Sequence, residues 1–178
     1  MSNIWFCSDL HFGHKNIDKF REPCGVTSEQ DNREKIQKDW IKQVRKNDDV
    51  YVLGDAAFTE ETVHDFGGLP GRKFLVRGNH DKLDTQTYLK YFEHVYGILK
   101  YKEFWLTHAP IHPSELRGKV NLHGHVHFDT VTLPWEEFGD DTPIMDSRYF
   151  NCCPENLWPT FGSALVSLEQ IRTYLKQP

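Results

Sequence analysis

Two aspartates, one asparagine and four histidines stand in five short clusters along the chain, and all seven are residue types that bind metal ions. Carboxylate and amide oxygens together with imidazole nitrogens suit two neighbouring divalent transition metals. Each cluster alone says little, because Asp-x-His and Gly-Asp pairs are common in turns. Together they predict a two-metal site whose candidate ligands are Asp9, His11, Asp55, Asn79, His108, His125 and His127.

The cluster at 78–81 adds residues that could move a proton. Its sequence is Gly78-Asn79-His80-Asp81. The glycine permits a sharp turn, the amide oxygen of Asn79 can bind metal, and an aspartate beside a histidine can hold the imidazole in place. The alternative is a polar turn with an Asx motif. We take His80 and Asp81 as candidate catalytic residues.

Each cluster follows a short apolar run that predicts a buried strand. In α/β proteins such strands aim functional loops at one edge of a sheet. We therefore expect the seven ligands to meet at strand ends. The strands expected before the clusters cover 4–8, 50–53, 73–77, 104–106 and 120–123.

Helices are expected between these strands. Ser28 is a suitable N-cap for a helix reaching about residue 45, and Thr59 for one ending near 66. Further helices are expected over 85–92 and after Ser167, where Gln170 would complete a capping box. Additional strands are expected at 96–99, 149–152 and 164–166. An irregular segment at about 128–148, rich in Asp, Glu and Pro, could gate the site or bind a partner.

The order and chemistry of the clusters resemble the calcineurin-like metallophosphoesterase superfamily. The match extends from the first strand to beyond residue 127, and the opening Asp9-Leu10-His11-Phe12-Gly13-His14-Lys15-Asn16 is similar to small single-domain bacterial and phage members. This resemblance implies an α/β sandwich: two mixed β-sheets packed face to face and flanked by helices. A single domain over residues 1–178 is expected.

The resemblance also implies a division of labour. One metal would be held by Asp9, His11 and His127, the second by Asn79, His108 and His125, and Asp55 would bridge them. Two such metals lower the pKa of a shared water, and the resulting hydroxide attacks phosphorus in line. His80 would stabilise the transition state or protonate the leaving oxygen, oriented by Asp81. Manganese is the expected metal, although iron, zinc, nickel and cobalt accept the same ligands.

Four polar residues beside the clusters are candidates for binding the substrate phosphate. They are His14, Lys15, Asn16 and Arg77. The alternative for the first three is a helix start that merely follows the metal loop. The alternative for Arg77 is a charge on the surface at a strand end.

The expected reaction is hydrolysis of a phosphodiester or phosphomonoester of a small nucleotide-like molecule. After Gly54-Asp55 the chain reads Ala56-Ala57-Phe58, so it lacks the Asp-Arg-Gly continuation of the Ser/Thr protein phosphatases. Three alternatives stay open. They are cleavage of a pyrophosphate bond in dinucleoside polyphosphates or nucleotide sugars, a nuclease, and a non-catalytic interaction module.

The amino-acid composition limits the classes of molecule that the protein could bind and the compartment in which it could function. A net charge of −5 over 178 residues argues against stable binding of duplex nucleic acid but allows a small phosphorylated substrate. A mean hydropathy of −0.62, with no secretory leader or long apolar run, predicts a soluble protein that does not enter membranes. The four cysteines lack zinc or disulfide spacing, which favours reduced thiols and a cytoplasmic location. Oligomeric state cannot be inferred from the sequence.

Overall fold

The strands form two mixed sheets in a computed structural model that describes residues 2–133 and 144–176. The first sheet has the order β4-β3-β2-β1-β9. β1 to β4 run parallel and β9 runs antiparallel to β1. Its strands are β1 Ile4–Cys7, β2 Asp49–Val52, β3 Arg72–Val76, β4 His94–Tyr96 and β9 Val166–Ser167.

The second sheet has the order β5-β6-β7-β8. β5 is antiparallel to β6, whereas β6, β7 and β8 run parallel to one another. The parallel strands therefore end at one edge of this sheet, as β1, β2 and β3 do in the first. Its strands are β5 Leu99–Tyr101, β6 Phe104–Leu106, β7 Val120–His123 and β8 Tyr149–Asn151.

Alternate side chains of the first sheet build two separate parts of the core. Along β1, Trp5 and Cys7 join the cluster that contains Ile36 and Trp40 of α2, while Phe6 joins the cluster containing Phe104 of β6. This follows from the two-residue period of a strand, which sends neighbouring side chains to opposite faces. One face of the sheet is therefore covered by helices and the other packs on the second sheet, which confirms the expected α/β sandwich.

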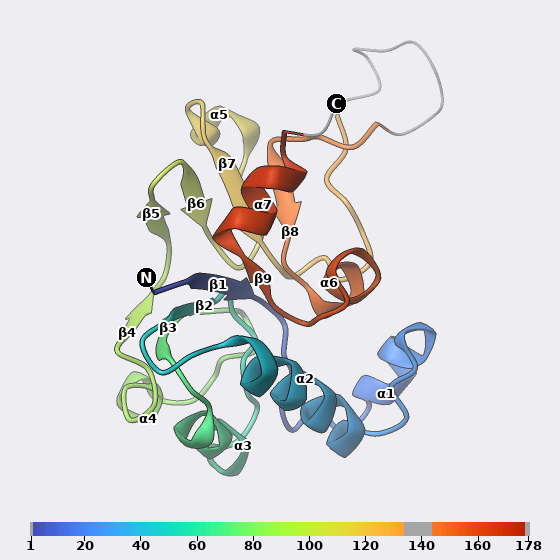
Figure 1. Ribbon diagram of the computed structural model, residues 1–178, viewed down its shortest axis with the longest axis vertical. Helices are drawn as coiled ribbons and strands as arrows, with labels where there is room; N and C mark the ends of the chain where they lie inside the picture. Colours follow the sequence, from blue (N-terminus) through green and yellow to red (C-terminus); the bar gives the residue numbers. More distant parts are fainter. Residues whose placement is uncertain (1, 134–143, 177–178) are drawn as a thin grey trace.

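Helices lie on the outside of both sheets (Figure 1). In that view α2, α3 and α4 lie below the first sheet, and α7 crosses the second. The helices of the described residues, including the 3-10 turns η1 and η2, are α1 Ile17–Arg21, η1 Glu22–Cys24, α2 Glu29–Gln43, α3 Glu60–His64, η2 Asp65–Gly68, α4 Thr85–Tyr88, α5 Pro113–Leu116, α6 Pro154–Phe161 and α7 Leu168–Tyr174.

The expected helix caps are present. The Ser28 hydroxyl accepts from the N–H of Asp31 at the start of α2. Thr59 caps α3, and Ser167 with Gln170 forms a complete capping box on α7. Each cap satisfies backbone donors that the first helical turn leaves unpaired.

The segment expected to be one strand at 96–99 is instead shared between the two sheets. β4 ends at Tyr96 in the first sheet, Gly97 and Ile98 are exposed, and β5 begins at Leu99 in the second. An apolar run alone does not reveal that the chain crosses between layers within it. The short helices α5 and α6 were also not expected, and α1 corresponds to the helix start that was the alternative for His14, Lys15 and Asn16.

Three further expectations concern the remaining chain. All four cysteines are free thiols. No helix in the described part of the chain is long and apolar enough to cross a membrane. Of the acidic segment at 128–148, residues 134–143 lie outside the described residues.

Candidate metal centre

The metal-ligand candidates lie in loops that leave the carboxyl ends of β1, β2, β3, β6 and β7. The loops after β1 and β2 continue to pair beyond the strands. The N–H of Asp9 donates to the carbonyl of Gly54, and the N–H of His11 donates to the carbonyl of Asp55, both over 2.9 Å. This pairing fixes the two aspartates and His11 relative to one another.

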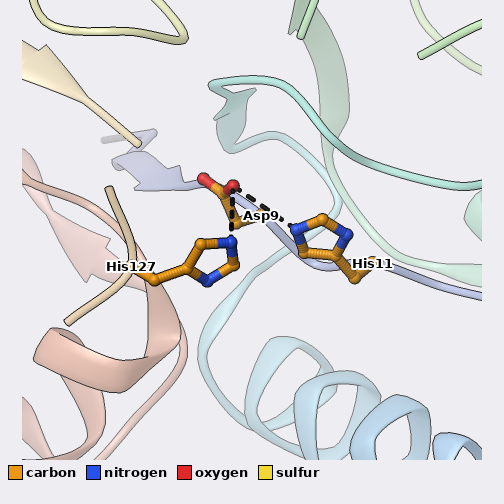
Figure 2. Close-up of side chains that lie close together, drawn as sticks. All are labelled: Asp9, His11 and His127. Carbon is orange, nitrogen blue, oxygen red and sulfur yellow. Dashed lines mark ion pairs between the residues drawn. The ribbon is translucent and has the colours of Figure 1, made fainter. Parts of the chain in front are cut away.

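Asp9, His11 and His127 form one group of potential ligands (Figure 2). The Nε2 atom of His11 lies 3.5 Å from Oδ1 of Asp9, and Nε2 of His127 lies 3.7 Å from the same oxygen. Figure 2 shows the two imidazoles converging on that carboxylate. Asp9 and His11 are buried, while His127 is half-buried.

The Asp55 carboxylate faces ligand candidates on two sides. Its Oδ2 lies 3.8 Å from Nε2 of His11 and 3.5 Å from Nε2 of His108. On the His108 side, the amide oxygen of Asn79 lies 2.7 Å from Nε2 of His108 and 3.1 Å from Nδ1 of His125. All seven predicted ligands are therefore brought into one cluster.

The atoms that face each other in this cluster fit a cation. Among the described residues, Oδ1 of Asp9 and both ring nitrogens of His11 are buried without a hydrogen-bond partner. The Nδ1 atom of His108 lies 2.9 Å from the carbonyl of Leu53, which can only accept, so the ring proton belongs there. In the neutral ring Nε2 is then a bare acceptor facing the Asn79 oxygen. Acceptors that converge in this way suit divalent metals.

The other oxygen of Asp9 is held from three directions. Oδ2 receives hydrogen bonds from the N–H of His125, over 2.8 Å, and from the Cys153 thiol, over 3.2 Å. The Ser8 hydroxyl lies 2.5 Å away. These contacts fix the carboxylate so that only Oδ1 points at the imidazoles.

Two glycines allow the loops to approach this closely. A Cβ atom on Gly124 would collide with the Ser8 hydroxyl and with Oδ2 of Asp9. On Gly54 it would collide with the ring of His108, and that glycine also has a φ of +91°. Larger residues at either position would push the ligands apart.

Several candidate ligands have a left-handed backbone, which is unusual for residues other than glycine. Their φ angles are 51° for Asp9, 53° for His11, 51° for Asp55, 71° for His125 and 51° for His127. Such conformations cost about 1–3 kcal/mol each and persist only where surrounding contacts enforce them. Strain of this kind concentrates at functional sites.

His80 lies at the edge of the ligand cluster. Its N–H donates to Oδ1 of Asp55 over 2.8 Å, and its ring stacks on Phe58 with centroids 5.3 Å apart. The ring is half-exposed and lies 5.9 Å, centroid to centroid, from that of His11. A histidine in this position can contact both the cluster and a bound molecule.

Asp81 was expected to orient the His80 ring, but its carboxylate does not contact that ring. Its carboxylate instead accepts from the N–H groups of Asp55, Ala56 and Gly78, over 2.8 to 2.9 Å. The turn at 78–81 directs the aspartate inward, toward the loop after β2. Asp81 thus holds the backbone that carries Asp55.

The four candidate phosphate contacts separate into two sets. His14 packs against the rings of His11 and Phe58, at 5.6 and 5.0 Å, while Lys15 and Asn16 are exposed. His14 therefore lies beside the cluster, and Lys15 and Asn16 follow it in the chain directly before α1. Arg77 differs from the expectation.

The Arg77 guanidinium holds its own loop instead of facing the ligands. It donates to the carbonyls of Asp81 and Leu83 and to the hydroxyl of Thr85. With its donors engaged in this way, Arg77 has a structural role in the loop.

Glu155 and Arg21, which the sequence did not single out, also contact the site. The Glu155 carboxylate accepts from Nδ1 of His127 over 2.9 Å and pairs with Arg21 over 2.7 Å. Burial raises the pKa of Glu155, but the Arg21 charge and the His127 hydrogen bond outweigh it and lower the pKa to about 2. Both residues lie in short helices with no motif, so only the packing reveals them.

Several known proteins are similar to this chain in sequence. The chain is 34% identical over 165 residues to the Gene 66 protein of Mycobacterium phage L5, covering 71% of this chain and 78% of that protein. It is 32% identical over 135 residues to an uncharacterized protein of Methanocaldococcus jannaschii, covering 71% and 70%.

A solved structure agrees over nearly the whole chain. A protein of unknown function from Aquifex aeolicus superposes with a TM-score of 0.69 at 25% identity, covering 98% of this chain and 100% of that one. The family model for calcineurin-like phosphoesterases matches residues 2–161. With the sandwich fold and the cluster of ligand residues, these matches show that the chain belongs to the calcineurin-like phosphoesterase family.

Proposed function

We propose that this protein is a dinuclear-metal phosphoesterase that hydrolyses a phosphodiester or phosphomonoester of a small nucleotide-like substrate. Family membership supports the coarser statement, a metal-dependent phosphoester hydrolase. The observation that supports a centre with two metals is the position of Asp55. Its Oδ2 lies between the Nε2 atoms of His11 and His108, at 3.8 and 3.5 Å, as a bridging ligand would.

The ligands divide into two halves around that carboxylate. Asp55 is common to both. In this proposal the first half is Asp9, His11 and His127, and the second is Asn79, His108 and His125. Two divalent ions, with manganese preferred, would neutralise charge on the phosphate oxygens and activate a water molecule as nucleophile.

The remaining chemistry belongs to side chains around the cluster. His80 would donate a proton to the leaving oxygen, since its ring is half-exposed beside the ligands and its backbone is tied to Asp55. Phe58 stacks on that ring and restricts its orientation. His14, Lys15 and Asn16 would bind the substrate beside His11.

The test is manganese-dependent hydrolysis of bis-p-nitrophenyl phosphate and of p-nitrophenyl phosphate by the wild type and His80→Ala. We expect His80→Ala to retain its manganese and to lose about 100-fold or more in turnover, as removal of a general acid does. His64→Ala is the matched control, because His64 is an exposed histidine bonded to Tyr91.

Three results of this test would each contradict a different part of the proposal. Normal turnover by His80→Ala would contradict the proton-donor role. Binding of fewer than two manganese ions by the wild type would contradict the dinuclear proposal. Two bound ions without hydrolysis of either ester would contradict the proposed substrate class and favour a pyrophosphate substrate or an interaction module.

A further inference from the structure

A buried ion pair lies directly behind one of the candidate metal ligands. The Nε atom of Arg21 is 2.7 Å from Oε1 of Glu155, and neither side chain has any exposed surface. Removing two charges from water is costly, and such a pair is often no more stabilising than apolar residues of the same size. A role in the adjoining site would account for its presence.

The first part of that role concerns the tautomer of His127. Oε1 of Glu155 also accepts from Nδ1 of His127, over 2.9 Å. Because a carboxylate can only accept, the ring proton is held on Nδ1. Nε2 is therefore left as the ligand atom, and it faces Oδ1 of Asp9 at 3.7 Å.

The second part concerns Arg21, which joins three segments. Besides Glu155 on α6, it donates to the backbone carbonyls of Asp9 and Leu10 and to the amide oxygen of Asn32 on α2. The loop carrying Asp9 and the helix carrying Glu155 are thereby fixed to one guanidinium. Asp9 and His127 come from distant parts of the chain, and this ion pair links them, because Arg21 contacts the Asp9 carbonyl and Glu155 contacts the His127 ring.

The other half of the centre is built differently. The Nδ1 atom of His108 points away from the other candidate ligands and contacts the carbonyl of Leu53, which carries no net charge. Two of the three residues in this half, Asn79 and His125, are exposed and His108 is buried, whereas Asp9 and His11 are buried and His127 is half-buried. The half with Asn79 is thus the more open and is supported by a backbone dipole, and the half with Asp9 is the more enclosed and is supported by a carboxylate.

We infer that Glu155, held by Arg21, is a positioning residue that makes the Asp9–His11–His127 half the tighter of the two metal sites. A carboxylate behind a ligating imidazole orients the ring and increases its basicity, which strengthens metal binding. The half containing Asn79, His108 and His125 is then the one that fills last. This inference rests on the proposed assignment of the ligands.

The test is a calorimetric titration of chelator-treated protein with Mn²⁺. The wild type should bind in two steps, and His125→Ala should lose the weaker step, which assigns it to the open half. Glu155→Gln should weaken the tighter step by about 10–100-fold and leave the weaker one unchanged. Glu103→Gln, which alters a surface carboxylate paired with Arg172, should change neither step.

Glu155→Gln leaves the buried Arg21 charge without its partner, which can impair folding. Circular dichroism would reveal this. In that case the double variant Arg21→Gln with Glu155→Gln, which removes both charges, should show the same selective weakening.

Equal weakening of both steps, or no change in either, would overturn the inference while leaving the proposed function intact. Failure of the wild type to bind manganese would overturn both. A merely structural role for Glu155 would lower stability without selecting one metal-binding step.

Discussion

The backbone N–H of His125 donates to Oδ2 of Asp9 over 2.8 Å, although the two residues are 116 positions apart. Asp9 follows a strand of the first sheet and His125 follows a strand of the second. This bond therefore ties the ligand-bearing edges of the two sheets to each other. It also holds the Asp9 carboxylate so that Oδ1 faces His11 and His127.

Removing a candidate ligand should lower the metal content and abolish turnover together. Asp55→Asn loses the charge that faces both His11 and His108, and His125→Ala removes an imidazole from the open half. We expect both variants to contain less manganese by elemental analysis and to show no measurable hydrolysis. Full manganese content in Asp55→Asn would contradict the bridging assignment.

Gly124→Ala should disrupt the site through its size alone. A Cβ atom at this position collides with the Ser8 hydroxyl and the Asp9 carboxylate, so the loop after β7 must move away. We expect loss of manganese binding and a lower melting temperature. Gly97→Ala is the matched control, because a Cβ atom there meets nothing within 4 Å. Similar behaviour of the two variants would show that the close approach is unimportant.

Asp81→Ala should destabilise the loop after β2. The change leaves the N–H groups of Asp55, Ala56 and Gly78 without their acceptor. An unsatisfied buried donor costs about 1–3 kcal/mol, so the free energy of unfolding in urea should fall by at least that amount. Asp65→Ala removes a half-exposed partner of Arg33 and should cost roughly 0–1 kcal/mol. A comparable loss in both variants would contradict the anchoring role.

Asp48 should make stability sensitive to acid. Burial raises the pKa of Asp48, but hydrogen bonds from the N–H groups of Asn3 and Arg45 and from the Trp5 indole outweigh it, so the folded-state pKa lies below its ordinary value. The carboxylate therefore stabilises the fold fully above about pH 4, the pKa in the unfolded chain, and this stabilisation is lost as the pH falls through the lowered folded-state pKa.

The measurement is urea unfolding of the wild type and Asp48→Asn at several pH values between about 2.5 and 6, a range that spans the ordinary Asp pKa. We expect Asp48→Asn to be less stable at the upper end and to lose less stability on acidification. Parallel curves for the two proteins would show that Asp48 does not contribute to the acid response.

Much of the site could be anticipated because its ligands follow strands. A buried strand is recognisable from a short apolar run, and the parallel strands of each sheet end at a common edge, so Asp9, Asp55 and Asn79 had to meet. The same reasoning could not orient side chains within a turn. Asp81 and Arg77 therefore belong to loop-stabilising contacts that adjacency to His80 and Gly78 did not reveal.

The contacts behind the ligands were beyond sequence reasoning for a different reason. Arg21 and Glu155 are 134 positions apart and lie in short helices without periodicity or motif. Their meeting depends on how α1 and α6 pack around the site. Likewise, the run at 96–99 has the composition of one strand, and only the crossing between sheets divides it.

The left-handed backbone at the candidate ligands is a conformation that residues with a side chain rarely adopt. Glycine would adopt those angles at Asp9, His11, Asp55, His125 and His127 without steric penalty, so the ligating side chains are not what the local backbone favours. The backbone angles alone would therefore favour glycine at these five positions. A functional need for the side chains would explain why they are present, a trade-off common at functional sites.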